Sequence, residues 1–175
     1  MNKGQGKREQ RVAIVHYWLV NMRGGERVVE ELCALYPQAD IFTLVCDRKR
    51  ISERLRRHRI ITSGLQEIPF ATRIYQNLLP LMSRALEEFD LAGYDIVISS
   101  ESGPAQGVIV PPGTLHVSYV HSPMRYCWNM YHEYQRQSGA VKRFFMRRFL
   151  HRIRIWDYVA AQRPDSLVAN SRHVQ

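Results

Sequence analysis

The chain has 175 residues, 45% hydrophobic and 23% charged, which indicates one globular domain with a proper core and argues against disorder. Its 25 Lys and Arg residues exceed its 16 Asp and Glu residues, giving a net charge of +9. Three widely spaced cysteines, Cys33, Cys46 and Cys127, argue against disulfides and a structural zinc site and suit a reducing compartment. There is no signal peptide and no apolar run near the roughly 20 residues that span a bilayer.

Short apolar runs alternate with segments of helical periodicity. The polar residues 1–10 are expected to be a disordered leader, and residues 11–175 one domain. Strands are predicted over 12–15, 41–45, 59–62, 95–99, 115–120 and 166–170. Helices are predicted from Gly25 to before Pro37, over 50–57, over 70–89 with a second helix starting at or just before Pro80, within 100–107, and over 139–162.

This alternation predicts an α/β fold, namely a Rossmann-like doubly wound parallel sheet with helices on both faces. Right-handed crossovers predict the spatial order 3-2-1-4-5-6, with the first strand central. Ligands of such sheets bind at the carboxyl ends of the strands, so the loops there are the candidate site. The side chains expected to face the core are Val28, Val29, Leu32 and Leu35 in the first helix, and Ile51 and Leu55 in the second.

The segment from His16 to Arg27 is predicted to be a polar loop in which Gly24 and Gly25 open a helix. Glycines let the backbone approach a ligand closely, and a helix N-terminus offers free N–H donors to an anion. The pattern predicts a phosphate site, and a plain glycine turn into a helix explains it equally well. Neither the GxGxxG fingerprint nor the Gly-Lys-Ser/Thr of a P-loop is present.

Two other strand ends carry polar groups. His121, which precedes a Ser-Pro pair and Arg125, could donate to a sugar hydroxyl while the arginine pairs with phosphate, or it could simply bond to backbone. Ser100 and Glu101 could face a substrate, but an N-cap and a first-turn acid of the next helix are the favoured interpretation. No paired carboxylates, HExxH, GxSxG or metal-ligand spacing is present, so no metal is predicted.

Two basic clusters suggest an anionic partner. In the helix over 139–162, an apolar stripe is expected to pack on the core while the cations mostly take the opposite face, a pattern compatible with attachment to anionic lipid. The stripe consists of Val141, Phe144, Phe145, Phe149, Ile153 and Trp156. The clusters are Arg48, Lys49, Arg50, Arg54, Arg56, Arg57 and Arg59, and then Lys142, Arg143, Arg147, Arg148, Arg152 and Arg154.

Six segments occur in a characteristic order, mostly at strand ends: VAIVHYWL (12–19), GGERV (24–28), ADIFTLV (39–45), YDIVISS (94–100), HSPMRY (121–126) and ANS (169–171). Together they resemble the family 4 glycosyltransferases, retaining enzymes of the two-Rossmann GT-B architecture. The resemblance is greatest to the bacterial branch with mannosyltransferases of O-antigen and exopolysaccharide assembly.

The resemblance implies transfer of a hexose, with mannose one candidate, from a nucleoside diphosphate sugar to a glycan or lipid-linked acceptor, without a metal or other cofactor. By residue match, Gly24 and Gly25 would lie against the donor diphosphate, and His121 would be the catalytic residue at the sugar. The family's donor-binding C-terminal domain, with its E-x7-E motif, is absent from these residues, so this acceptor-side domain is expected to be inactive alone. Further candidate substrate contacts are His16, Tyr17, Ser100, Glu101, Arg125, Asn170 and Ser171.

Two other functions are open. A non-catalytic Rossmann-like module could bind nucleic acid or another polyanion through the basic clusters, although no nucleic-acid motif is present. A nicotinamide-dependent oxidoreductase is disfavoured because GxGxxG is missing and Asp47 is a poor substitute for the acid that ends the second strand. The expected location is the cytoplasm, peripheral on the inner face of the membrane.

Overall fold

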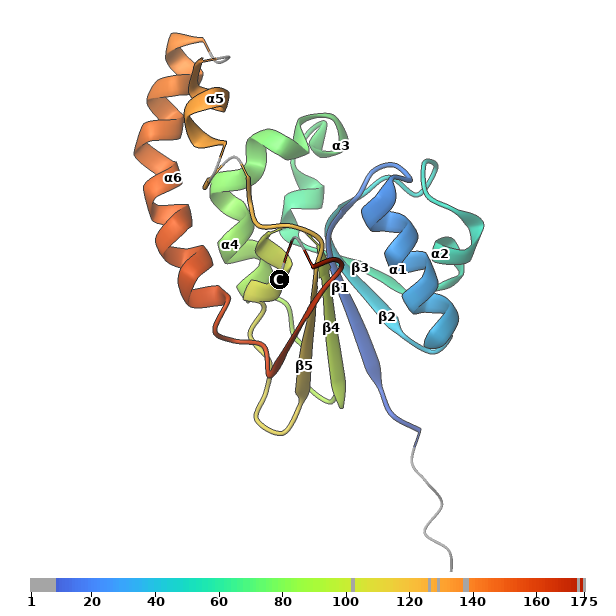
Figure 1. The fold of residues 1–175 in the computed structure, drawn as a ribbon. Helices are drawn as coiled ribbons and strands as arrows, with labels where there is room; N and C mark the ends of the chain where they lie inside the picture. Colours follow the sequence, from blue (N-terminus) through green and yellow to red (C-terminus); the bar gives the residue numbers. More distant parts are fainter. Residues whose placement is uncertain are drawn as a thin grey trace, which may run out of the picture.

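The computed structural model describes residues 9–101, 103–125, 127–128, 130–136, 139–172 and 174, which form a parallel sheet with helices on both faces (Figure 1). The strand order is β3-β2-β1-β4-β5-β6, which confirms the predicted fold class and order. The strands are β1 Val12–Leu19, β2 Asp40–Cys46, β3 Ile60–Thr62, β4 Ile96–Glu101, β5 Leu115–Val120 and β6 Ser166–Ala169. The helices are α1 Gly24–Leu35, α2 Glu53–Arg57, α3 Ala71–Ile74, α4 Leu79–Glu87, α5 Tyr131–Arg136 and α6 Ala140–Ala160, with 3-10 turns η1 Gly64–Glu67, η2 Tyr75–Leu78 and η3 Pro104–Gly107.

The central strand β1 is buried on both faces. Ile14 packs in a cluster with Val29 of α1, whereas Val15 packs in a second cluster with Met82 and Leu86 of α4. Successive residues of a strand point to opposite faces, so a continuous apolar run suits a sheet covered on both sides. In Figure 1, α1 and α2 accordingly lie on one side of the sheet and α4 and α6 on the other.

The strands at the sheet centre are longer than the apolar runs that predicted them. β1 continues to Leu19, so His16 and Tyr17 are strand residues, not loop residues. β4 continues to Glu101, so Ser100 and Glu101 both lie in a strand, and their predicted roles as N-cap and first-turn acid of the next helix are wrong. Gly103 is the N-cap residue of η3 instead. The ladder to neighbouring strands satisfies backbone groups here, whatever the polarity of the side chains.

Helices α2 and α4 agree with their local signals, and α1 does so except at Leu35. α4 begins at Leu79, immediately before Pro80, as predicted. Both Ile51 and Leu55 are buried as predicted. Leu35 is wrong as a core residue, because 73% of its surface is exposed. It lies six residues beyond the buried Val29, which places it about 240° further around α1.

Helix α6 packs across α4 and η3 through its inner face. Leu150 and Ile153 form a small cluster with Met124 and Cys127. Trp156 lies so close to the backbone of η3 that a Cβ on Gly107 would overlap its ring. A glycine is therefore needed at position 107 for this close approach.

The predicted apolar stripe of α6 is only partly an inner face. Phe144 is 67% exposed and points away from the core, which corrects its assignment, because the inner face is centred on Leu150, Ile153 and Trp156. The side chains of Val141 and Phe145 lie outside the described residues. Helix α5 was not predicted, since its sequence YHEYQR has no apolar periodicity.

None of the helices in the described ranges is both long and apolar enough to cross a membrane. Of the leader predicted over residues 1–10, only residues 9 and 10 belong to the described part of the chain.

Candidate functional site

The first part of the candidate site is the start of α1, at the carboxyl end of β1. The first helical hydrogen bond in α1 runs from Arg27 N to Arg23 O at 3.1 Å, so the N–H groups of Gly24 and Gly25 precede it and need other partners. The buried carboxylate of Glu26 accepts from Arg23 N at 3.0 Å and so occupies one donor of this turn. The remaining donors can receive an anion.

The two glycines differ in what lies next to them. A Cβ on Gly25 would stand 3.3 Å from Cε1 of His16, closer than ordinary van der Waals contact, so a larger residue there would press on the imidazole. A Cβ on Gly24 would meet nothing within 4 Å. Gly24 therefore presents open backbone to a ligand, while Gly25 joins the helix start to the strand beneath it.

His16 is completely buried under this helix start. Its Nδ1 donates to the carbonyl oxygen of Ser100 in the neighbouring strand β4. Burial lowers the pKa of His16 to about 4, with a smaller contribution from His121, so the ring is neutral at pH 7. In that tautomer Nε2 carries a lone pair, and this buried atom has no hydrogen-bond partner among the described residues.

His121 reaches the same place from the end of β5. Its Nε2 lies 3.1 Å from Oγ of Ser100, and its ring packs edge-on against Tyr119, with the centroids 5.2 Å apart. Partial burial lowers the pKa of His121 as well, which favours the neutral ring. A neutral imidazole offers one N–H donor and one acceptor, which suits the hydroxyls of a sugar.

A continuous set of contacts therefore links four residues. They are Gly25 of α1, His16 of β1, Ser100 of β4 and His121, which follows β5. In Figure 1 the strands run upward from the amino-terminal tail. Ser100 is the penultimate residue of β4 and His121 directly follows β5, so the set lies toward the carboxyl ends of the strands. The predicted candidates from three separate segments are thus brought together. We call these four residues the histidine cluster.

Among the other predicted site residues, Tyr17 contacts the histidine cluster, because its ring packs edge-on against His16 with the centroids 4.8 Å apart. Tyr17 also packs at a tilt on Trp18, with centroids 3.9 Å apart, and against the core. Arg125 is exposed in a turn, and no described contact joins it to the cluster. Asn170 and Ser171 are exposed beyond the end of β6. The side chain of Glu101 lies outside the described set, although its backbone pairs with Val120.

A cavity of about 690 Å³ lies at the carboxyl ends of β5 and β6, and His121 is not itself one of the described residues that line it. Val120 and Ser122, the two sequence neighbours of His121, both belong to its wall. Ser171 is there too, so one candidate outside the histidine cluster still borders the same opening. The remaining lining residues are Gly103, Gln106, Pro123, Met124, Asp157, Ala161, Leu167, Val168, Ala169, Arg172 and Val174.

The sequence interpretation missed Asp157, a buried carboxylate in the wall of this cavity. It accepts from Trp128 Nε1 at 2.8 Å and from Gln106 Nε2 at 3.3 Å. Burial raises the pKa of Asp157, and these two hydrogen bonds act against that rise. The available signal was its position: it is the first acid after the basic run of α6, and it lies four residues after the inward-facing Ile153.

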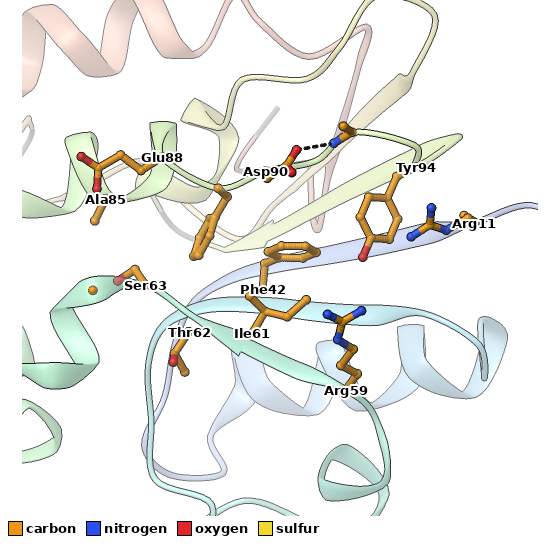
Figure 2. A pocket seen from close by; sticks show the side chains of 13 residues that line it. Arg11, Phe42, Arg59, Ile61, Thr62, Ser63, Ala85, Glu88, Asp90 and Tyr94 are labelled. Atoms are coloured by element: carbon orange, nitrogen blue, oxygen red, sulfur yellow. Dashed lines mark hydrogen bonds between the residues drawn. The ribbon is translucent and has the colours of Figure 1, made fainter.

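A second hollow of about 500 Å³ lies away from the histidine cluster, beside the start of β1 and the edge strand β3 (Figure 2). Arg11 stacks over the ring of Tyr94 at 4.7 Å, and Tyr94 donates to Asp40 at 2.5 Å. Asp40 also lies 3.8 Å from Arg59. These charges are already matched to one another, which is the pattern of a structural network. Among the described residues, no three His, Cys, Asp or Glu side chains gather closely enough to hold a metal ion.

Comparison of the chain with protein-family models, with curated proteins and with solved structures found no match.

Proposed function

We propose that this chain is the acceptor-side domain of a retaining glycosyltransferase that moves a hexose from a nucleoside diphosphate sugar to a glycan or lipid-linked acceptor. The observation that supports it is the histidine cluster, which places the open backbone at Gly24 and the neutral ring of His121 at the same end of the sheet. The helix start would receive the diphosphate, and the imidazole would bond to the sugar.

In this proposal Ser100 and His16 position the catalytic residue. The Ser100 hydroxyl fixes the ring of His121, and its carbonyl is in turn held by Nδ1 of His16. A neutral His121 does not repel a developing positive charge at the anomeric carbon, as an imidazolium would. The adjoining cavity of about 690 Å³ is large enough for a sugar unit, and we assign it to the acceptor or the transferred hexose.

Two observations favour this function over the other two considered. A nicotinamide-binding domain needs a glycine fingerprint that the segment from Asn21 to Glu26 does not have. A nucleic-acid module would need its cations gathered on one face, whereas α2 and α6 lie on opposite sides of the molecule (Figure 1).

The test is a donor-consumption assay with a panel of nucleoside diphosphate sugars and lipid-linked acceptors. It compares the 175-residue chain with a longer chain that also carries the donor-binding domain implied by the resemblance. We expect that only the longer chain transfers the sugar. Holding both substrates at reacting distance lowers the activation free energy by about 7–11 kcal/mol, and this needs both walls of the cleft. Efficient transfer by the short chain would contradict the two-domain proposal, and no transfer by either would contradict the function.

A further inference from the structure

The outer face of α6 is unusual because it exposes large apolar side chains. Ile155 is 55% exposed, Tyr158 68% and Val159 51%, and Phe144 is also on this side at 67%. At about 100° per residue these four positions fall within roughly a third of the helix circumference. A folded domain seldom leaves such a stripe open along one helix unless it contacts something.

Arginines flank this stripe. Arg143, Arg148 and Arg152 are exposed, and none of them has an acidic partner within the described ranges. The sequence also holds no acid between 142 and 156. We call the four apolar side chains and these three arginines the outer face of α6.

The other basic cluster, around α2, is different. Arg57 lies 2.6 Å from Glu53, Arg54 lies 3.6 Å from Glu31, and Arg50 lies 3.7 Å from Asp47. Its charge is partly neutralised within the domain, and the described residues there show no exposed apolar stripe between the cations. The two clusters therefore have different chemistry, although their charge in the sequence is similar.

We propose that the outer face of α6 is the surface by which this protein docks on an anionic lipid bilayer. The apolar side chains would enter the interface between headgroups and acyl chains, and the arginines would reach lipid phosphates beside them. The inner face of α6 is fixed to the domain by Leu150, Ile153 and Trp156. The helix would therefore lie flat on the membrane as a preformed, rigid element.

Lipid fits this surface better than nucleic acid does. The phosphates of a nucleic acid would pair with the arginines but would leave Ile155 and Val159 in water. A bilayer interface can bind the arginines through lipid phosphates and bury the apolar side chains at the same time. The docking proposal does not depend on sugar transfer.

The test is co-sedimentation of the chain with vesicles of equal parts phosphatidylglycerol and phosphatidylcholine, and with vesicles of phosphatidylcholine alone. We expect binding to the mixed vesicles that falls steeply as salt rises, and much weaker binding to the neutral ones. Each cation near such a surface is worth about a fivefold gain, so the triple variant Arg143→Gln, Arg148→Gln, Arg152→Gln should bind roughly 100-fold more weakly.

Two further variants make the result specific. The control Lys49→Gln, Arg50→Gln, Arg56→Gln removes the same charge from exposed positions around α2 and should keep most of the binding. The apolar variant Ile155→Ser, Tyr158→Ser should lose binding while keeping every arginine. All variants should keep the wild-type thermal unfolding transition, because the changed side chains are exposed. Equal losses in the two charge variants, unchanged binding of the apolar variant, or preference for duplex DNA over the mixed vesicles would overturn the proposal.

Discussion

His121 is the residue whose loss should separate chemistry from folding. It is half-buried at the end of β5, and its one described hydrogen bond is to Ser100. If it supplies one preorganised hydrogen bond to the reacting sugar, His121→Ala should lower kcat about 100- to 1,000-fold in the longer, two-domain chain that we propose. Steady-state kinetics with His132→Ala, an exposed histidine of α5, as the control would check this. Wild-type turnover by His121→Ala would remove it from the site.

Gly24 and Gly25 should respond in opposite ways to the same methyl group. Gly25→Ala places Cβ 3.3 Å from the buried His16 ring, which cannot retreat easily, so we expect a loss of about 1 kcal/mol in the free energy of unfolding. Gly24→Ala meets nothing within 4 Å and should not destabilise the fold, but it should weaken diphosphate binding. Urea unfolding and nucleotide titration of both variants measure these effects. Equal stability of the two would show that His16 does not constrain Gly25.

Buried histidines should make stability depend on pH in the acidic range. Burial lowers the pKa of both His16 and His116 to about 4, from an ordinary value of 6.5. Between these values the unfolded chain binds more protons, so stability is complete above pH 6.5 and is lost as pH falls toward 4. Each histidine accounts for about 3 kcal/mol over that range. Urea midpoints measured across this interval should fall, and His116→Gln should make the fall shallower. A flat profile would contradict the burial of these rings.

At the scale of the elements, the contact between η3 and α6 should be sensitive to a single methyl group. A Cβ on Gly107 would overlap the ring of Trp156, whose Nε1 also donates to Glu87 at 2.9 Å. We expect Gly107→Ala to destabilise the domain by about 1–3 kcal/mol, the usual cost of overpacking. The matched control is Gly64→Ala, the first residue of η1, where a Cβ also meets nothing within 4 Å. Similar melting temperatures for the two variants would count against this packing.

The elements also show what local sequence can and cannot predict. Runs such as 41–45 predicted buried strands, and Pro80 predicted the start of α4, because burial and proline geometry act locally. The continuation of β4 through Ser100 was missed because pairing with β5 makes it a strand. The outward side of Phe144 was missed for a related reason, since the position of α4 and η3 decides which side of α6 is the inner one.

The candidate site was predictable only in part. His16, Ser100 and His121 were named because parallel strands end at one edge, but their mutual contacts depend on strand register. Asp157 was missed because nothing in the sequence places α6 beside the ends of β5 and β6. A site assembled from separate strands and helices needs the three-dimensional arrangement before its members can be connected.

For the whole molecule, the central claim is that a nucleoside diphosphate sugar binds at the carboxyl ends of the strands. The most direct measurement is a chemical-shift titration of the 175-residue chain with nucleoside diphosphate sugars, with NAD and with a duplex oligonucleotide. We predict weak, saturable shifts at the Gly24 and Gly25 amides and at the His121 ring with the sugars, and no comparable shifts with the oligonucleotide. NAD also carries a diphosphate, so it should shift the two amides but not the His121 ring. Shifts confined to the hollow between Arg11 and Arg59, or an equal response of the His121 ring to NAD, would contradict the claim.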